Sequence, residues 1–159
     1  MIEYERKFLV DAVVWDNIKN LAPFAVVEVK QGYVCADEQT TVRIRHSNGS
    51  WYWNVKQATD DPAKRIEHEF IVPDAVSAEE LYSTLKHTIE KTRYEMRLGH
   101  LKIEIDEFHG RYHGVVIAEV ELTSEADSEF FNLCKPSFIG REVTGMKEWS
   151  NHAMSMRWV

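Results

Sequence analysis

Charged residues alternate with uncharged ones along several strand-like segments of this chain, and many of the resulting pairs carry charges of one sign. The opening segment, MIEYERKFLV, places Glu3, Glu5 and Lys7 at alternate positions. Because successive side chains of a β-strand point to opposite faces, these three charges would share one face. Like charges two residues apart on a strand lie about 7 Å apart, which costs free energy unless a counter-charge lies between them.

The same arrangement recurs along the sequence with both signs. The basic pairs are Arg43/Arg45 and Lys91/Arg93, and the acidic pairs are Glu67/Glu69 and Glu119/Glu121. A single strand of this kind is ordinary in an antiparallel sheet that has one solvated face. Repeated pairs of one sign are better explained by a sheet that closes with its charged faces inward. Such a closed sheet would have a basic and an acidic inner wall, and its apolar faces would pack outward against helices.

Period-two patterning and turn signals predict eight strands, with a strong hairpin turn at Asn48-Gly49. The strands are Glu3–Val10, Ala25–Cys35, Thr40–His46, Trp51–Gln57, Arg65–Val72, Ile89–Leu98, Leu101–Phe108 and Val115–Leu122. The predicted helices are Asp11–Leu21 and Ser77–His87, and the C-terminal part is predicted to be helical in pieces around Glu125–Leu133 and Lys147–Arg157. Ser77 and Glu80 form a candidate capping box for the second helix.

Consecutive strands joined by hairpins favour antiparallel pairing, and eight strands can close into a barrel. The predicted fold class is therefore α+β: an eight-stranded antiparallel β-barrel, or tunnel, with a polar charged interior and helices packed outside. A chain of 159 residues suits one domain, so we expect a single domain over residues 1–159.

Composition excludes several classes of partner. The net charge of −7 argues against binding nucleic acid across the outer surface. The sequence has no apolar run of membrane-spanning length and no signal-peptide layout, so we expect a cytoplasmic protein without a membrane partner.

Cys35 and Cys134 are expected to be reduced thiols. His109 and His113 have the spacing of a helical metal pair, but neighbouring glycines predict a loop there. The chain is expected to be a monomer or homodimer.

A polyanion bound together with divalent cations would neutralise both walls of the predicted tunnel. Carboxylate oxygens suit Mg²⁺, and arginine and lysine suit phosphate oxygens. The candidate phosphate-binding set is Lys7, Arg43, Arg45, Lys56, Lys91 and Arg93. The sequence has no P-loop pattern, so the phosphates would be held by side chains. A triphosphate bridged by Mg²⁺ fits this description.

With these residues, the chain resembles members of the CYTH superfamily, also called triphosphate tunnel metalloenzymes. It resembles the short bacterial members most of all. The family's N-terminal Glu-x-Glu-x-Lys signature is met by Glu3, Glu5 and Lys7. Six further segments follow in the family's order: QGYV, TVRIR, EKTRY, IDEFHG, AEVEL and IGREVTG. The resemblance extends over nearly the whole chain. It implies an eight-stranded tunnel that hydrolyses or cyclises triphosphates with Mg²⁺ or Mn²⁺.

The resemblance also implies roles for individual residues. The substrate-binding candidates are Lys7, Arg43, Arg45, Lys56, Lys91 and Arg93, with Tyr33 near the phosphates. The metal-binding candidates are Glu3, Glu5, Glu119, Glu121, Glu67 and Glu69. The catalytic candidates are Glu5, Lys7, Glu121, Asp106 and Lys147. Lys147 would reach in from a C-terminal helix that, in relatives, can plug one tunnel mouth.

The leading functional hypothesis is a metal-dependent inorganic triphosphatase that converts tripolyphosphate to pyrophosphate and phosphate. Alternatives are a class IV adenylate cyclase, a thiamine triphosphatase and a non-catalytic module that binds polyphosphate or nucleotides. The cyclase needs an adenine pocket, and thiamine triphosphate needs aromatic stacking, for which the sequence shows no dedicated pair. A binding module could lose its carboxylates, whereas both acidic pairs are present here.

Overall fold

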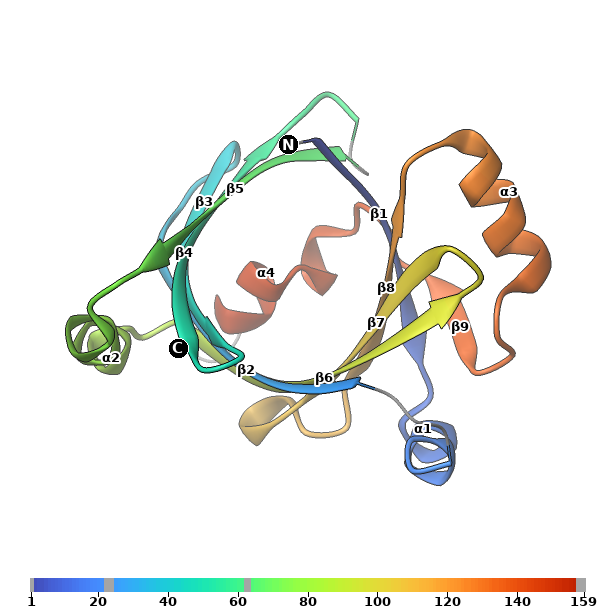
Figure 1. Ribbon diagram of the computed structural model, residues 1–159, viewed down its shortest axis with the longest axis horizontal. Helices are drawn as coiled ribbons and strands as arrows, with labels where there is room; N and C mark the ends of the chain where they lie inside the picture. Colours follow the sequence, from blue (N-terminus) through green and yellow to red (C-terminus); the bar gives the residue numbers. More distant parts are fainter. Residues whose placement is uncertain (1, 22–24, 62–63, 157–159) are drawn as a thin grey trace.

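A closed antiparallel β-barrel forms the body of the protein (Figure 1). The computed structural model describes residues 2–21, 25–61 and 64–156, with side chains from Tyr4 onward. The strands are β1 Ile2–Val10, β2 Ala25–Ala36, β3 Thr40–Ser47, β4 Ser50–Ala58, β5 Lys64–Val72, β6 Thr88–Leu98, β7 Leu101–Phe108, β8 Val116–Leu122 and β9 Ile139–Glu142. The helices are α1 Ala12–Ile18, α2 Ala75–Thr84, α3 Glu125–Cys134 and α4 Asn151–Met156, with 3₁₀ turns at Gly110–Tyr112 and Lys147–Trp149.

The barrel closes where the first strand meets the fifth. The strand order is β5-β4-β3-β2-β6-β7-β8-β1, and β1 also pairs with β5. Among the described residues this closing seam is short, with Ile2, Glu3 and Tyr4 pairing with residues 64–66. Farther along, β1 pairs with β8 over Tyr4–Val10, and its last residues also pair with β9. All eight predicted strands are present within two residues of their predicted bounds, so the predicted barrel is confirmed.

Helices α1, α2 and α3 pack on the outside of the barrel (Figure 1). The outward faces of β1, β7 and β8 form the main core with Trp15 of α1 and Phe131 of α3. A second cluster joins Ile44 and Trp51 to Ala78 of α2. The apolar half of each alternating strand therefore faces the helices, which leaves the polar half for the lumen.

The start of α2 corrects one prediction. The helix is capped by Asp74, whose carboxylate accepts hydrogen bonds from the backbone N–H groups of Val76 and Ser77. Ser77 already lies in the first turn, and its hydroxyl donates to Asp74 at 2.6 Å. The Ser77–Glu80 capping box is therefore wrong, and the helix ends at Thr84 and not at His87.

The C-terminal region is helical in pieces, as predicted. Over Lys147–Arg157 it forms a 3₁₀ turn followed by the short helix α4, and Arg157 lies outside the described residues. Strand β9 was predicted only as a sequence match, not as a strand. Met154 of α4 packs with Ile89, Phe108 and Ile117, which are inward-facing barrel residues near one end. This C-terminal segment therefore closes one end of the barrel, and Figure 1 shows α4 across its opening.

Candidate functional site

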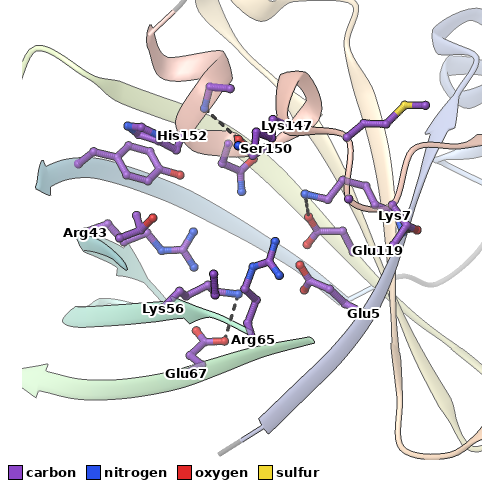
Figure 2. Close-up of a pocket in the computed structure, with 18 of the residues that line it drawn as sticks. Glu5, Lys7, Arg43, Lys56, Arg65, Glu67, Glu119, Lys147, Ser150 and His152 are labelled. Atoms are coloured by element: carbon purple, nitrogen blue, oxygen red, sulfur yellow. Dashed lines mark hydrogen bonds and ion pairs between the residues drawn. The ribbon is translucent and has the colours of Figure 1, made fainter. Parts of the chain in front are cut away.

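A cavity of about 940 Å³ occupies the barrel (Figure 2). Its walls come from the inward faces of the strands and from residues of the C-terminal segment. Twelve predicted site residues line it: Glu5, Lys7, Tyr33, Arg43, Arg45, Lys56, Glu67, Glu69, Arg93, Glu119, Glu121 and Lys147. Eleven of them lie on strands, where alternate side chains share the inner face, and Lys147 reaches the cavity from the C-terminal 3₁₀ turn.

One wall is basic and is built on β3, β4 and β5. Arg43, Arg45, Lys56 and Arg65 lie on it. Carboxylates of β5 compensate part of this charge, since Lys56 pairs with Glu67 at 3.1 Å and Arg45 pairs with Glu69. Asn54 on β4 is buried and donates hydrogen bonds to both of these glutamates. Glu67 and Glu69 therefore brace the basic wall.

Two guanidinium groups of this wall keep unused donors. Arg43 is 7% exposed, and its Nη1 donates to the Gln31 side chain at 3.3 Å. The buried Nε atoms of Arg43 and Arg45 have no hydrogen-bond partner among the described residues. A buried donor without a partner costs about 1–3 kcal/mol. Both arginines line the cavity, and a guanidinium group whose donors are not all satisfied by the protein is suited to an anion that supplies several acceptor oxygens, such as a phosphate chain.

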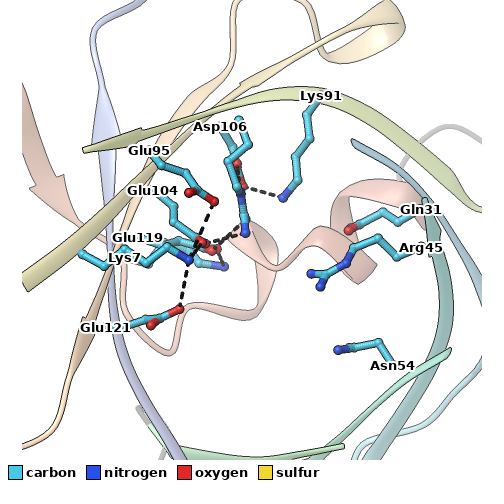
Figure 3. A network of polar contacts seen from close by, with 12 residues as sticks. Lys7, Gln31, Arg45, Asn54, Lys91, Glu95, Glu104, Asp106, Glu119 and Glu121 are labelled. Carbon is cyan, nitrogen blue, oxygen red and sulfur yellow. Dashed lines mark hydrogen bonds and ion pairs between the residues drawn. The ribbon is translucent and has the colours of Figure 1, made fainter. Parts of the chain in front are cut away.

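The opposite wall is acidic and lies on β1, β7 and β8 (Figure 3). Glu119 pairs with Lys7 at 2.9 Å and with Arg93 at 3.4 Å. Arg93 also contacts Glu104 and donates from Nε to Asp106 at 2.7 Å. Cations on the inner faces thus sit between the carboxylates, which removes most of the repulsion that the alternating pattern would otherwise create.

These neighbours shift the carboxylate pKa values in opposite directions. Burial acts to raise the pKa of Glu119, but Lys7, Lys91 and Arg93 outweigh it and hold that pKa well below its ordinary value. Burial and the nearby Glu104 raise the pKa of Glu121. Glu119 is therefore a fixed negative charge, whereas Glu121 binds a proton more readily.

Lys91 and Asp106 form a pair beneath the cavity surface, and neither lines the cavity itself. Each is 1% exposed, and the Lys91 ammonium also lies 5.5 Å from the Phe108 ring centre. Burial lowers the pKa of Lys91 to about 8, against the opposing effect of Asp106. Burial acts to raise the pKa of Asp106, but Arg93 and Lys91 outweigh it and leave that pKa lowered. Both residues hold the wall in place from behind.

The C-terminal segment contributes to the cavity where it closes the barrel. Lys147, Ser150 and His152 line the cavity there, opposite Arg43 and Lys56 in Figure 2. The His152 ring lies 5.1 Å from the Tyr33 ring, centre to centre. The Lys7 backbone carbonyl accepts a hydrogen bond from the Val143 N–H at 2.8 Å, and this ties the segment to β1.

The acidic wall offers the oxygen ligands that Mg²⁺ and Mn²⁺ prefer. Glu5, Glu104, Glu119 and Glu121 all line the cavity there, so the donor set fits such an ion in its chemistry. No three acidic, histidine or cysteine side chains within the described part of the chain surround one point as metal ligands do. Glu3 pairs with Arg65 through its backbone, and its side chain lies outside the described residues. A metal role for Glu67 and Glu69, on the basic wall, stays a prediction.

Several lining residues were absent from the predicted site. Arg65 lies at an alternate position with Glu67 and Glu69 on β5 and shares their inner face. The alternation in the sequence could therefore have predicted Arg65 as a lining residue. Lys102 and Glu104 alternate with uncharged residues on β7 and share the inner face with Asp106, so the same pattern applies to them. His152 gave no signal, because the short helix that carries it has no periodic pattern of its own.

Comparison with known proteins places this chain in a family. The CYTH domain pattern matches residues 1–131. An inorganic triphosphatase of Acetivibrio thermocellus is 39% identical over 150 residues, which cover 94% of this chain and 90% of that protein. An inorganic triphosphatase of Nitrosomonas europaea is 31% identical over 160 residues and covers 98% of both chains. A crystal structure of an inorganic triphosphatase superposes with a TM-score of 0.67 at 28% identity, covering 96% of this chain and 93% of that one.

Within the described residues, no helix is long and apolar enough to cross a membrane. The domain match extends over most of the chain, and both curated relatives align from end to end or nearly so. The barrel and the two-walled cavity have the form that the sequence resemblance implied. This chain belongs to the CYTH domain family.

Proposed function

We propose that the protein hydrolyses tripolyphosphate to pyrophosphate and phosphate inside the barrel, with Mg²⁺ or Mn²⁺ as the required cation. The observation that carries the proposal is the cavity with two walls of opposite charge, in which Arg43, Arg45, Lys56 and Arg65 lie opposite a wall of carboxylates. Such a cavity suits a ligand that carries anionic oxygens to one wall and cations to the other. The relatives named as inorganic triphosphatases support the same substrate.

The basic wall would bind and orient the phosphate chain. Arg43 and Arg45 would hold phosphate oxygens through their guanidinium groups, while Lys56 and Arg65 add positive charge from the same side. Lys147 would bind from the closed end of the cavity. A chain fixed along one wall keeps the bond to be broken in line with water from the other, and such positioning accounts for most of the catalysis of phosphoryl transfer.

The acidic wall would handle the attacking water. Glu5 and Glu121 are the candidates to hold this water and to accept its proton, and burial together with Glu104 raises the pKa of Glu121, which makes its carboxylate a better proton acceptor. Lys7 and Arg93 keep Glu119 ionised and in position. A divalent cation bound at these carboxylates would neutralise charge that develops on the phosphate oxygens.

A substrate panel tests this function. Purified protein is incubated with tripolyphosphate, ATP or thiamine triphosphate, with and without Mg²⁺ or Mn²⁺, and phosphate, pyrophosphate and cyclic AMP are quantified. We expect metal-dependent phosphate release that is fastest with tripolyphosphate. Cyclic AMP from ATP would indicate a cyclase, preference for thiamine triphosphate would indicate the second alternative, and binding without turnover would indicate a non-catalytic module.

The acidic wall supplies a matched pair of variants. Glu5→Gln and Glu121→Gln each remove one charge without changing side-chain size, and each is expected to lower kcat by about 10²–10³. Circular dichroism checks that both variants stay folded. Near-normal turnover of either one with Mg²⁺ contradicts its assigned role.

The proposed substrate is a small anion, so neither nucleic acid nor a membrane takes part in the proposal. Cys35 and Cys134 are free and exposed, which suits a reducing cytoplasm. Cytoplasmic location and a monomeric or homodimeric state remain predictions.

A further inference from the structure

Lys102 occupies an unusual position for a cation in a wall expected to bind metal. It lies on β7 and lines the cavity among carboxylates. Its ammonium pairs with Glu104 and lies 3.7 Å from a Glu95 oxygen and 4.0 Å from a Glu121 oxygen. One ammonium therefore serves three carboxylates that come from three adjacent strands.

The charges around Lys102 depend on one another. Burial acts to lower the pKa of Lys102, but Glu104, Glu121 and Glu95 outweigh it, so that pKa is raised and the side chain is ionised at neutral pH. Without this ammonium, Glu104 and Glu121 would face each other with less compensation. A divalent cation could bind the same two carboxylates in place of the ammonium. While the ammonium holds these oxygens, they attract a metal ion less strongly.

We propose that Lys102 is a tethered cation that occupies Glu104 and Glu121 in the metal-free protein and competes with the divalent metal for them. The proposal rests on the proposed function, because it assumes that the acidic wall binds the metal. Lys102 thereby sets how tightly metal binds and keeps the barrel neutralised while metal is absent.

Lys102 is better placed for such displacement than the other cations of the wall. Arg93 is anchored by Asp106, which accepts hydrogen bonds from both Nε and Nη2 at 2.7 and 2.8 Å. Lys7 pairs with Glu119 and also reaches the Trp149 carbonyl at 3.5 Å. The Lys102 side chain is 29% exposed, twice the exposure of Arg93, so its flexible stem has solvent to move into.

Titration of Mn²⁺ alone, without substrate, tests the proposal by isothermal calorimetry. Lys102→Met removes the competing charge and keeps much of the apolar stem, so Mn²⁺ is expected to bind about tenfold tighter than to wild type. Lys30→Met is the matched control, because Lys30 is an exposed strand lysine on β2 and does not line the cavity. The control makes the same change in net charge and is expected to leave Mn²⁺ affinity unchanged. Equal or weaker Mn²⁺ binding by Lys102→Met overturns the proposal.

A double-mutant cycle locates the effect. If Lys102 acts through Glu104, the gain from Lys102→Met shrinks in a Glu104→Gln background, whereas a gain of full size there overturns the mechanism. Lys102→Arg retains the charge and is expected to bind Mn²⁺ no more tightly than wild type. Lys102→Arg also tests the proposal if a urea titration shows that Lys102→Met does not fold. A clear gain in Mn²⁺ affinity with the charge retained would contradict competition between Lys102 and the metal.

The outcomes separate this proposal from the proposed function. Wild type that releases no phosphate from tripolyphosphate contradicts the function, whatever Lys102 does. Active wild type with the same Mn²⁺ affinity as Lys102→Met contradicts only the role of Lys102. Wild type that binds no Mn²⁺ contradicts both.

Discussion

Arg43 is held in a conformation that favours a ligand over stability. Its side chain is buried, its Nε lacks a partner among the described residues, and one of its contacts is a long hydrogen bond to Gln31. Residues that bind a charged substrate in a closed cavity carry this cost because the ligand completes their hydrogen bonds only when it arrives.

Replacing Arg43 with Met should therefore move stability and activity in opposite directions. We expect the free energy of unfolding in urea to rise by about 1 kcal/mol, because an unpaired buried donor is removed. The kcat/KM for tripolyphosphate should fall by about 10²–10³. Lys30→Met, with the same change in charge on the outer surface, should alter neither quantity. A destabilised Arg43→Met variant would show that Arg43 is held by contacts within the protein.

The contribution of the single residue Lys91 to the free energy of unfolding should depend on pH. Its pKa is about 8 in the folded protein and about 10.4 in an unfolded chain. Between these values the unfolded chain holds more protons, so the contribution of Lys91 to stability increases as pH rises. The difference in unfolding free energy between wild type and Lys91→Met should grow by roughly 1 kcal/mol per pH unit above pH 8. A difference that stays constant from pH 7 to 10 contradicts the depressed pKa.

Residue parity was the most informative signal in the sequence. It correctly grouped Arg43 with Arg45 and Glu119 with Glu121, because a strand leaves no choice about which side chains share a face. Alternation tells which face of a strand a side chain is on, but not how deeply that side chain is buried. It therefore did not show that Lys91 and Asp106 lie behind the cavity surface. It also does not show which charges pair across strands, and this is why Glu67 and Glu69 were not expected beside the basic wall.

Local signals were less reliable at the scale of whole elements. Ser77 and Glu80 have capping-box spacing, yet Asp74 begins α2 because its carboxylate reaches two backbone N–H groups of the first turn. Strand β9 and helix α4 are short, and their positions depend on contacts with β1 and with the inner end of the barrel. Neither element is specified by its own sequence pattern, so tertiary packing decided both.

Two substitutions at the start of α2 test which residue caps the helix. Asp74→Ala should lower the free energy of unfolding by about 1 kcal/mol, because two backbone donors lose their acceptor. Ser77→Ala removes only an exposed hydroxyl that donates to Asp74, so its effect should be less than about 0.5 kcal/mol. Urea denaturation of the two variants measures both values. The reverse order would restore Ser77 as the cap.

At the scale of the whole molecule, the barrel is closed by unequal seams. Strands β6 and β7 pair from Lys91–Phe108 to Leu98–Leu101, whereas β1 and β5 pair over three residues in the part of the chain that the structure describes. The sequence predicted closure from the inward charges but could not rank the seams, because pairing length depends on strand stagger.

Native-state hydrogen exchange should reveal this difference. Amides that pair between Ile2–Tyr4 and residues 64–66 are expected to exchange faster than those between β6 and β7, since fewer hydrogen bonds break when the short seam opens. Mass spectrometry of peptides from the two regions measures the rates. Equal protection in both regions contradicts opening at the β1–β5 seam.

We propose that a phosphate chain binds in the lumen between walls of opposite charge. A crystal structure of the protein with tripolyphosphate, grown without divalent metal so that turnover is suppressed, tests this most directly. We expect density for the phosphate chain inside the barrel, with its oxygens within hydrogen-bond reach of the Arg43 and Arg45 guanidinium groups. Tripolyphosphate bound only on the outer surface, with no contact to either arginine, would contradict binding in the lumen.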